Sequence, residues 1–247
     1  MTFLKLVNDI KQKYATNNNV VIFEILFKTS KLIKSKIDFL TYRNKQIDFK
    51  SERIYKYLDA YFYKNKPLGQ IVRHTKFCGI KIDIYKNIFE PRSETELITE
   101  KIIEYLKHNH KLINGVDLCC GTGCIGLAIK KHCTWVNITS IDINPKAVRN
   151  TIHNSKLNNL KIKTYIGDFY KTLIDKRLKF DFVVCNPPYI KQNKLDKTMI
   201  KYETNISFNN SSDSLYFYKL LIKNKKKFLN SGGKIFFENP NCKLLTI

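Results

Sequence analysis

An apolar run that ends in two prolines constrains the fold of this chain more than any other feature. It lies within Phe180–Ile190, which reads FDFVVCNPPYI. The segment Phe182–Cys185 carries no polar side chain, a pattern typical of a strand buried on both faces of a parallel sheet. Pro187 and Pro188 end the strand because proline cannot donate to a sheet ladder. The turn is therefore predicted at the carboxyl end of a strand, where open α/β sheets place their active sites.

The second half of the chain alternates between strand and helix patterns, which indicates a parallel sheet covered by helices on both faces. We therefore predict an α/β fold with a Rossmann-like sheet. The expected strands are Gly115–Cys120, Val136–Ile141, Lys161–Ile166, Phe180–Cys185 and Gly233–Phe237. The expected helices are Leu97–Leu106, a helix from the glycine-rich turn to about Lys131, Ala147–Leu157 and Lys219–Leu229.

Three segments are predicted along the chain. Residues 1–75 carry apolar side chains at helical spacing, such as Leu4, Val7 and Ile10, and we interpret them as a small helical substrate-recognition domain. Residues 76–92 alternate in the manner of a β-hairpin linker. Residues 93–247 carry the strand and helix alternation and form the predicted catalytic domain.

The chain is strongly basic, with a net charge of +23 that arises from 44 Lys and Arg against 21 Asp and Glu. Such a charge suits an acidic partner such as RNA, DNA or a ribosome-associated protein. The sequence is also rich in Lys, Asn and Ile, as AT-rich coding sequence is, and it holds no compact arginine-rich run. We therefore favour a compositional origin for the charge, with ribosome association as the alternative, and we expect no direct need for nucleic acid.

The seven cysteines are odd in number and include no CxxC pair, so neither a disulfide framework nor a metal site is indicated. The apolar segment Val20–Phe27 is too short to span a bilayer, and the first ten residues lack a secretory pattern. We expect a cytoplasmic monomer that does not bind membranes.

A glycine-rich turn and two acidic strand ends suggest a nucleoside-containing cofactor. The turn, Asp117–Gly123, permits close approach of a ligand to the backbone. Asp142 ends the next strand, where a carboxylate can accept both ribose hydroxyls. Asp168 and Phe169 follow the third strand, where an acid and a ring could read and stack on an adenine. The turn has no Walker lysine, which disfavours phosphoryl transfer.

Together these motifs resemble those of class I S-adenosylmethionine-dependent methyltransferases, and within that class the glutamine N5-methyltransferases of the HemK type. The resemblance runs from about Pro67 to Glu238 and rests on IFEPRSETE, DLCCGTGCIG, SIDINPKAV, GDF and NPPYI. It implies a Rossmann-like fold and methyl transfer to the glutamine of the Gly-Gly-Gln motif of peptide-chain release factors. It implies that S-adenosylmethionine is held by Asp117, Cys119, Cys120, Gly121, Thr122, Gly123, Asp142, Asp168, Phe169 and Asn186. It also implies that the target glutamine is surrounded by Phe89, Arg92, Asn186, Pro187, Pro188 and Tyr189.

The proline turn has groups that suit methylation of an amide nitrogen, which is a poor nucleophile because its lone pair is delocalised into the carbonyl. The side-chain oxygen of Asn186 and the carbonyl of Pro187 could accept both N–H groups of the target, and Tyr189 could stack on the flat amide. We therefore predict Asn186, Pro187 and Tyr189 as the catalytic residues, acting by positioning and by stabilising developing positive charge.

Alternatives remain at this point. NPPY is shared with adenine-N6 and guanine-N2 nucleic acid methyltransferases. The PRS and FCG residues also resemble those of enzymes that methylate a glutamine of a ribosomal protein. A third alternative is that the chain is a non-catalytic remnant of a methyltransferase. Members of the family usually have glycine where Arg73 stands, and they continue beyond the position of Ile247. We accordingly expect a shortened C-terminus, with the fifth strand as an exposed sheet edge.

Overall fold

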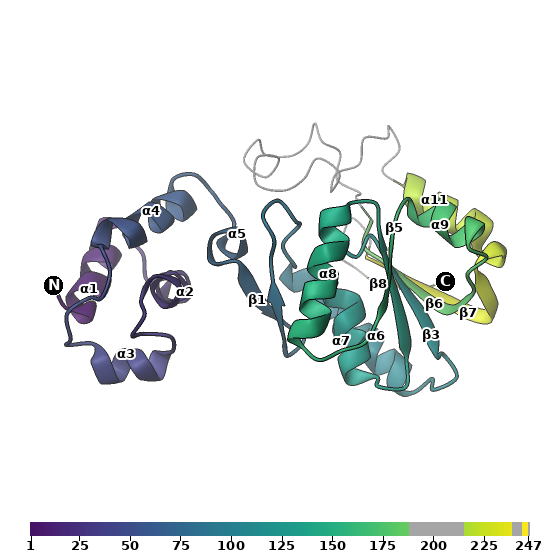
Figure 1. Ribbon diagram of the computed structural model, residues 1–247, viewed down its shortest axis with the longest axis horizontal. Helices are drawn as coiled ribbons and strands as arrows, with labels where there is room; N and C mark the ends of the chain where they lie inside the picture. The colour runs from purple at the N-terminus through teal and green to yellow at the C-terminus, as the bar shows by residue number, and fades with distance from the viewer. Residues whose placement is uncertain (188–214, 239–243, 247) are drawn as a thin grey trace. The chain divides into compact units, whose positions relative to one another are not determined.

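The computed structural model describes residues 1–187, 215–238 and 244–246, and it divides into two compact units, Met1–Arg73 and His74–Ile247 (Figure 1). The predicted site residues Pro188 and Tyr189 lie outside the described residues. None of the described helices is both long enough and apolar enough to cross a membrane. The roles that the sequence suggests for the parts of the chain stay predictions.

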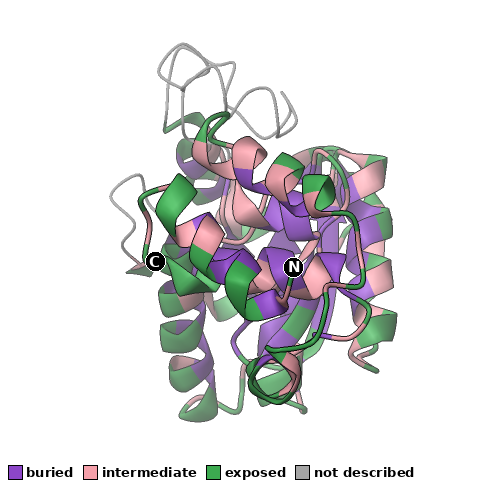
Figure 2. Cartoon of the chain, turned by 90° about the vertical axis from the view of Figure 1, so that its left-hand side faces the viewer, coloured by how far each residue is buried: buried purple, intermediate pink, exposed green. Residues whose placement is uncertain are grey.

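The first unit is helical because its apolar residues recur at helical spacing and face one core. Buried side chains from α1, α2 and α4, such as Leu6, Ile25 and Leu58, make up that core, and Figure 2 shows these helix faces as buried. Asp48 fixes the loop after α2 by accepting hydrogen bonds from the backbone N–H groups of Lys31 and Leu32, each at 2.7 Å. The helices are α1 Phe3–Lys13, α2 Asn19–Thr29, α3 Lys36–Tyr42, α4 Ser51–Phe62 and α5 Leu68–Val72.

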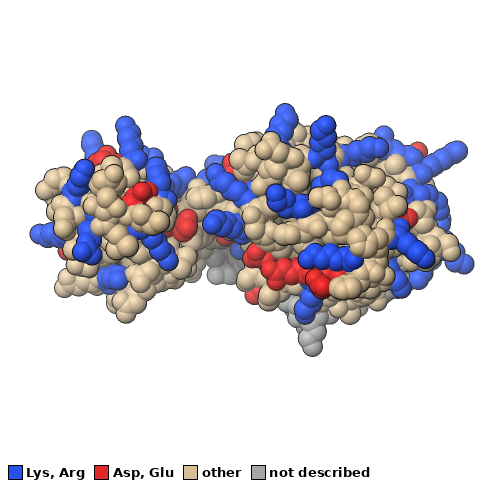
Figure 3. Space-filling view, turned by 90° about the horizontal axis from the view of Figure 1, so that it is seen from below, with Lys and Arg blue, Asp and Glu red and all other residues tan. Residues whose placement is uncertain are grey.

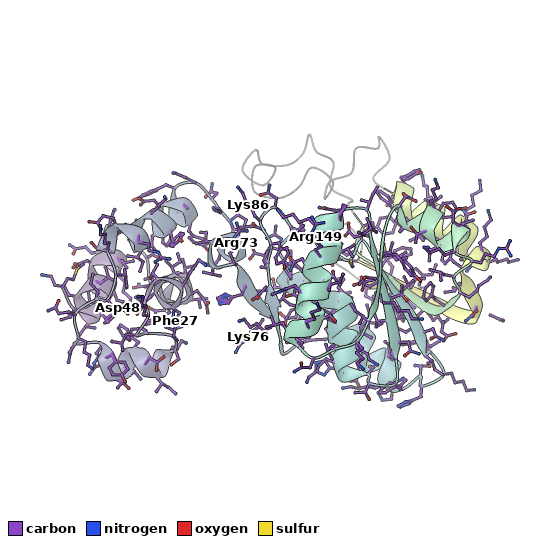
Figure 4. All side chains as sticks on the ribbon, in the orientation of Figure 1. Phe27, Asp48, Arg73, Lys76, Lys86 and Arg149 are labelled. Atoms are coloured by element: carbon purple, nitrogen blue, oxygen red, sulfur yellow. The ribbon has the colours of Figure 1, made fainter. Side chains whose placement is uncertain are left out.

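Arg73 ends the first unit in a left-handed backbone conformation, with φ of 70° and ψ of 18° (Figure 4). This region favours glycine because a side chain there crowds the backbone. The glycine that the resemblance leads one to expect at this position therefore has a conformational reason. In this chain the Arg73 guanidinium instead donates a hydrogen bond to the Gln70 side chain at 2.8 Å.

The second unit opens with the antiparallel hairpin of β1 His74–Phe77 and β2 Ile80–Asp83, followed by a six-stranded sheet in the order β5-β4-β3-β6-β7-β8. The sheet strands are β3 Asn114–Leu118, β4 Asn137–Asp142, β5 Lys163–Ile166, β6 Phe180–Cys185, β7 Leu229–Glu238 and β8 Leu244–Thr246. The helices are α6 Ser93–Lys107, α7 Cys124–His132, α8 Pro145–Leu157, α9 Phe169–Asp175 and α11 Tyr216–Asn224, which the 3-10 turn η3 Lys225–Lys227 continues.

Side chains on the two faces of the sheet form separate cores, which confirms the predicted Rossmann-like α/β class. On one face Val184 and Phe236 pack with side chains of α6 and α7, such as Ile102 and Leu127. On the other face Val183 and its neighbours pack with side chains of α9 and α11. The five strands from β3 to β7 pair in parallel, so their carboxyl ends meet at one edge.

Three details of the predicted elements are corrected by the structure. The fifth strand, β7, is not the sheet edge, because β8 pairs with it in antiparallel fashion, with Leu245 opposite Phe237. The helix expected over Lys219–Leu229 begins and ends earlier, since β7 starts at Leu229. Helix α9 was not predicted; its first turn is capped by the Asp168 carboxylate, which accepts from the N–H of Lys171 at 2.8 Å.

Candidate active site

The glycine-rich turn between β3 and α7 folds through left-handed backbone at three positions. Cys119, Gly121 and Gly123 have φ values of 59°, 58° and 80°. The N–H of Gly121 donates to Oδ2 of Asp142 at 2.9 Å, which ties the turn to the end of β4. The two remaining residues of the predicted loop, Cys120 and Thr122, are buried in the same turn. The predicted cofactor loop is thus held in shape by the predicted ribose acid.

Asp117 lies on β3 and is completely buried. Its Oδ2 accepts a hydrogen bond from the N–H of Gly126 at 3.0 Å, which anchors the first turn of α7. Its Oδ1 is buried with no hydrogen-bond partner among the described residues. Burial raises the pKa of this carboxyl to about 7, against the opposing effect of the Gly126 N–H, and the nearby charge of Asp142 adds to the rise. Asp117 therefore anchors a helix, and its contact with a cofactor stays a prediction.

Asp142 presents its carboxylate at the end of β4, next to the turn. Its second oxygen, Oδ1, accepts from the N–H of Asn144 at 2.9 Å. Burial raises the pKa of Asp142, while the N–H groups of Asn144 and Gly121 oppose that rise. Each carboxylate oxygen can accept more than one hydrogen bond, so Asp142 keeps acceptor capacity for hydroxyl groups.

Two residues of α8 that the sequence analysis missed also hold the turn. The hydroxyl of Thr151 donates to the carbonyl of Gly121 at 3.2 Å, and Nδ2 of Asn154 donates to the carbonyl of Thr122 at 2.9 Å. A Cβ atom on Gly123 would lie 2.6 Å from Cγ2 of Thr151, so α8 packs directly on the glycine. The turn is clamped from α8 as well as from β4.

The same face of α8 carries a ladder of asparagines that occupies the open edge of β2. Nδ2 and Oδ1 of Asn154 bond the carbonyl and the N–H of Asp83, each at 2.9 Å. One turn later, Asn158 bonds the N–H and the carbonyl of Lys81 in the same way. One turn earlier, Oδ1 of Asn150 accepts from the N–H of Tyr85 at 2.9 Å, and its Nδ2 donates to the carbonyl of Asp83 at 2.8 Å. Four helical residues rise about 6 Å and two strand residues about 6.8 Å, so the spacings match closely. Asparagine at every fourth position is the sequence signal that could have revealed this ladder.

The two residues predicted to read an adenine have structural partners of their own. Asp168 is exposed and caps α9, as described above. Phe169 is only 5% exposed and lies in the core, with its ring centroid 5.9 Å from that of Phe217. Their roles toward a ligand stay predictions.

The turn after β6 brings together groups from three elements. Leu118 and Cys185 are opposite in the sheet, so Asn186 and Cys119 each follow directly after that pair. Nδ2 of Asn186 donates to Oε2 of Glu238 at 2.9 Å, and to the hydroxyl of Thr95 at 3.4 Å. Pro187 is buried beside Asn186, whereas Pro188 and Tyr189 lie outside the described residues. Glu238 and Thr95 were not predicted as site residues.

Phe89 and Arg92 lie between β2 and α6, and both side chains are half-buried. The Arg92 guanidinium carbon sits 4.7 Å from the centroid of the Phe89 ring, a cation–π contact. Arg92 also immediately precedes α6, which supplies Thr95. The two side chains are thus in contact with one another, and their role toward a substrate stays a prediction.

The groups at this edge of the sheet fit the cofactor that the resemblance implies. A Cβ atom on Gly121 would meet no heavy atom within 4 Å, so the backbone of the turn is open to a ligand. Asp142 can accept hydroxyl donors, and the unpartnered Oδ1 of Asp117 is a buried acceptor at the base of the turn. A nucleoside that carries hydroxyl groups and positive charge matches these acceptors.

The family model and the sequence relatives that this chain matches agree with this assignment. Residues 92–239 match the family model "Methyltransferase small domain". The chain is 33% identical to a release factor glutamine methyltransferase of Clostridium acetobutylicum, over 84% of this chain and 74% of that one. A relative of the same name from Mycoplasma mycoides is 32% identical, over 94% of this chain and 82% of that one. A third, from Thermodesulfovibrio yellowstonii, is 37% identical over 71% of this chain and 64% of that one. A solved SAM-dependent methyltransferase from Agrobacterium tumefaciens is 15% identical, with a TM-score of 0.48 over 66% of this chain and 51% of that one.

Proposed function

Because the chain belongs to the family of release factor glutamine methyltransferases, we propose that it methylates the side-chain amide nitrogen of the Gly-Gly-Gln glutamine in peptide-chain release factors. S-adenosylmethionine supplies the methyl group when bound. The glycine-rich turn, Asp117 and Asp142 would hold it, and Asn186 would receive the target amide.

One observation carries this proposal: the clamped glycine-rich turn and Asn186 follow neighbouring strands of the sheet. The turn begins one residue after Leu118, and Asn186 follows Cys185, the residue opposite Leu118. Strands lie about 4.8 Å apart, so a cofactor on the turn and an amide at Asn186 would be neighbours. Such proximity is what a group transfer between two bound molecules requires.

The protein's part in the reaction is to aim the amide nitrogen. Oδ1 of Asn186 and the carbonyl oxygen of Pro187 accept the two N–H groups of the target, which leaves the nitrogen lone pair facing the cofactor. As positive charge develops on that nitrogen, the same two acceptors stabilise it. No base is needed beforehand, because the nitrogen becomes acidic once it gains the methyl group.

The experiment that tests the proposal is methyl transfer from labelled S-adenosylmethionine to a purified release factor. We expect label in the wild-type release factor and none in a variant that lacks the Gly-Gly-Gln glutamine. Losing one acceptor of developing charge typically lowers kcat by ~100- to ~1000-fold, so Asn186→Ala should lose activity to that degree while it still binds cofactor. Equal labelling of ribosomal protein or RNA would refute the assignment of the substrate.

We further propose that the first unit recognises the release factor. Two apolar side chains on α3, Ile37 and Leu40, are 75% and 63% exposed, as is typical of a surface that binds another protein. Ile37→Ser with Leu40→Ser should raise KM for the release factor and leave kcat unchanged. The matched control is Ile113→Ser with Ile166→Ser, two exposed apolar residues of the second unit. An unchanged KM in the α3 variant would refute this role.

The basic charge suggests where a ribosome contact would fall, and we propose a cluster of exposed cations near the amino end of β6. Figure 3 shows Lys and Arg side chains over much of the face that it displays, and in the sequence they are closely spaced just after α9 and around η3. The backbone carbonyl of Lys226 accepts a hydrogen bond from Nζ of Lys179 at 2.8 Å, which places the two segments side by side. The exposed cations are Lys176, Arg177, Lys179, Lys223, Lys226 and Lys227, and the half-buried Lys225 lies among them.

Co-sedimentation with ribosomes tests this contact. Lys176→Gln with Lys223→Gln and Lys226→Gln should reduce co-sedimentation at low salt. A control with Lys76→Gln, Lys101→Gln and Lys131→Gln, three exposed lysines elsewhere, removes the same charge. Equal loss in both variants would assign the attraction to overall charge. We also propose that the enzyme acts as a monomer in the cytoplasm, which light scattering and cell fractionation would check.

A further inference from the structure

The carboxylate of Glu238 is buried at the carboxyl end of β7, beside the turn that carries Asn186. Glu238 is only 5% exposed. Cys185 and Phe237 are opposite in the sheet, so Asn186 and Glu238 each follow directly after that pair. Burying a carboxylate is costly unless hydrogen bonds compensate, so a buried acid next to a catalytic amide calls for an explanation.

The hydrogen bonds of Asn186 use the donors of its amide and leave its acceptor. Nδ2 donates to Oε2 of Glu238 at 2.9 Å and to Oγ1 of Thr95 at 3.4 Å. An amide NH2 group has two donors, and these two bonds employ both of them. The side-chain oxygen, on the other branch of the same planar group, accepts no hydrogen bond from the described residues, and we assign its acceptor sites to another molecule.

An ionised carboxylate accepts hydrogen bonds and cannot donate them, so Glu238 distinguishes the two ends of the Asn186 amide. If the amide turned over, Oδ1 would face the carboxylate and two acceptors would oppose one another. The bond to a charged group would then be lost, and such bonds are among the stronger ones in proteins. Glu238 therefore holds the amide with its oxygen pointing away from β7.

The backbone at Glu238 is fixed as well. The hydroxyl of Tyr218, on α11, donates to the carbonyl of Glu238 at 2.7 Å. The ring of Tyr218 packs edge-to-face on Phe237, with centroids 4.9 Å apart. Thr95 is 3% exposed and is held in the first turn of α6. Three separate elements thus hold the two partners of the Asn186 amide.

We propose that Glu238, assisted by Thr95, is a positioning residue that sets Asn186 as an acceptor and so selects a substrate that offers N–H donors. This inference rests on the proposed function, in which Asn186 Oδ1 receives the target amide. It adds two residues to the site and states what each does. A turned Asn186 would present donors to the target N–H groups and would hold it poorly for transfer.

Kinetics of Glu238→Gln test the inference, because glutamine keeps the size of the side chain and adds a donor. Either end of a glutamine amide can face Asn186, so the acceptor orientation is no longer enforced. We expect kcat to fall about 10- to 100-fold, because the variant loses the hydrogen bond to the Glu238 carboxylate that fixes the Asn186 amide in one orientation. The cofactor Kd and the melting temperature should stay near those of the wild type. Thr95→Val should lower kcat less, and Thr95→Ser should restore it because the hydroxyl returns.

A double-mutant cycle separates positioning from a general structural effect. If Glu238 acts through Asn186, then Glu238→Gln should cause no further loss in an Asn186→Ala background. Multiplied losses would show that Glu238 acts independently and would overturn the inference. Wild-type kcat in Glu238→Gln would overturn it too, and would leave the proposed function intact.

A second measurement does not depend on activity. In protein labelled with ¹⁵N-asparagine, the side-chain NH2 signal of Asn186, assigned by its absence in Asn186→Ala, should be slow to exchange in the wild type. In Glu238→Gln it should exchange faster. The same slow exchange in both proteins would overturn the inference. Slow exchange lost in Glu238→Gln, in an enzyme that binds cofactor and methylates no release factor, would refute the proposed function and uphold the orientation of Asn186.

Discussion

Replacing Asp117 by asparagine removes a charge that the fold buries completely. Burial raises the pKa of this carboxyl from 3.8 to about 7, although the Gly126 N–H favours the ionised form. An asparagine oxygen can accept the same hydrogen bond. Ser140 is opposite Asp117 in the sheet and its hydroxyl has no partner among the described residues, so it is the candidate acceptor for the new NH2 group. The substitution therefore exchanges a buried charge for a neutral group of the same shape.

The pKa values give the size and the sign of the effect. A change from 3.8 to about 7 corresponds to about 4 kcal/mol at 1.36 kcal/mol for each pKa unit. Below about pH 4 both the folded and the unfolded chain carry the proton, and there is no penalty. Between about pH 4 and 7 the unfolded chain releases its proton first, so stability falls as pH rises. Above about pH 7 the folded protein carries the full penalty.

Urea unfolding of the wild type and of Asp117→Asn at pH 5 and pH 8.5 measures this penalty. The difference in unfolding free energy, variant minus wild type, should increase by about 3 kcal/mol from pH 5 to pH 8.5. Asp181→Asn is the matched control: hydrogen bonds from Asn230 and from the N–H groups of Asn114 and Ile113 outweigh desolvation and lower the Asp181 pKa. The difference in unfolding free energy between Asp181→Asn and the wild type should not change between pH 5 and pH 8.5. A flat difference for Asp117→Asn would refute the buried-charge argument.

Three further predictions concern the parts that hold the turn and the first unit. Asn154→Ala removes the partners of the Asp83 N–H and the Thr122 carbonyl, while Asn150 still donates to the Asp83 carbonyl, so the free energy of unfolding should fall by about 2 kcal/mol or more in urea titration. Asn158→Ala, at the solvent side of the same ladder, should cost about 1 kcal/mol, and equal costs would contradict the argument. Gly123→Ala should weaken cofactor binding in calorimetry and destabilise more than Gly79→Ala. Both glycines have positive φ, but an added Cβ meets Thr151 at Gly123 and nothing within 4 Å at Gly79, so equal losses would show that the contact is harmless. Arg73→Gly relieves the strain of the left-handed backbone but loses the hydrogen bond to Gln70. The free energy of unfolding of the first unit in urea should therefore change by less than about 1 kcal/mol. A larger loss would show that Arg73 is needed for stability.

Much of the site was predictable because strand-end residues follow from local pattern. Asp142 and Asn186 each stand where an apolar run ends, and parallel pairing alone brings such ends to one edge, whereas Asp117 lies within β3 just before the turn. Asp168 also follows a strand, but its carboxylate caps α9, a short helix that the strand pattern did not predict. Local pattern thus located the acids at strand ends, but it did not reveal that Asp168 caps a helix; the roles of these acids toward a ligand stay predictions.

The partners of these residues were not predictable, because they come from distant parts of the chain. Glu238 is 52 residues from Asn186 and Thr95 is 91, and only the folded sheet and α6 bring them together. In the sequence, Thr95 reads as a helix-capping residue, whereas the structure places it inside the first turn of α6 with no side-chain cap at Arg92. The asparagine ladder of α8 could have been noticed from its spacing, although not its partner strand.

The most direct test of the central claim is to locate the methyl group in a release factor after reaction with this enzyme and S-adenosylmethionine. Fragmentation of the tryptic peptide that contains Gly-Gly-Gln in a mass spectrometer assigns the added mass to one residue. We predict a single methyl group on the side chain of that glutamine, formed ~100- to ~1000-fold more slowly when Asn186→Ala replaces the wild type. A methyl group on any other residue, or undiminished methylation by Asn186→Ala, would contradict it.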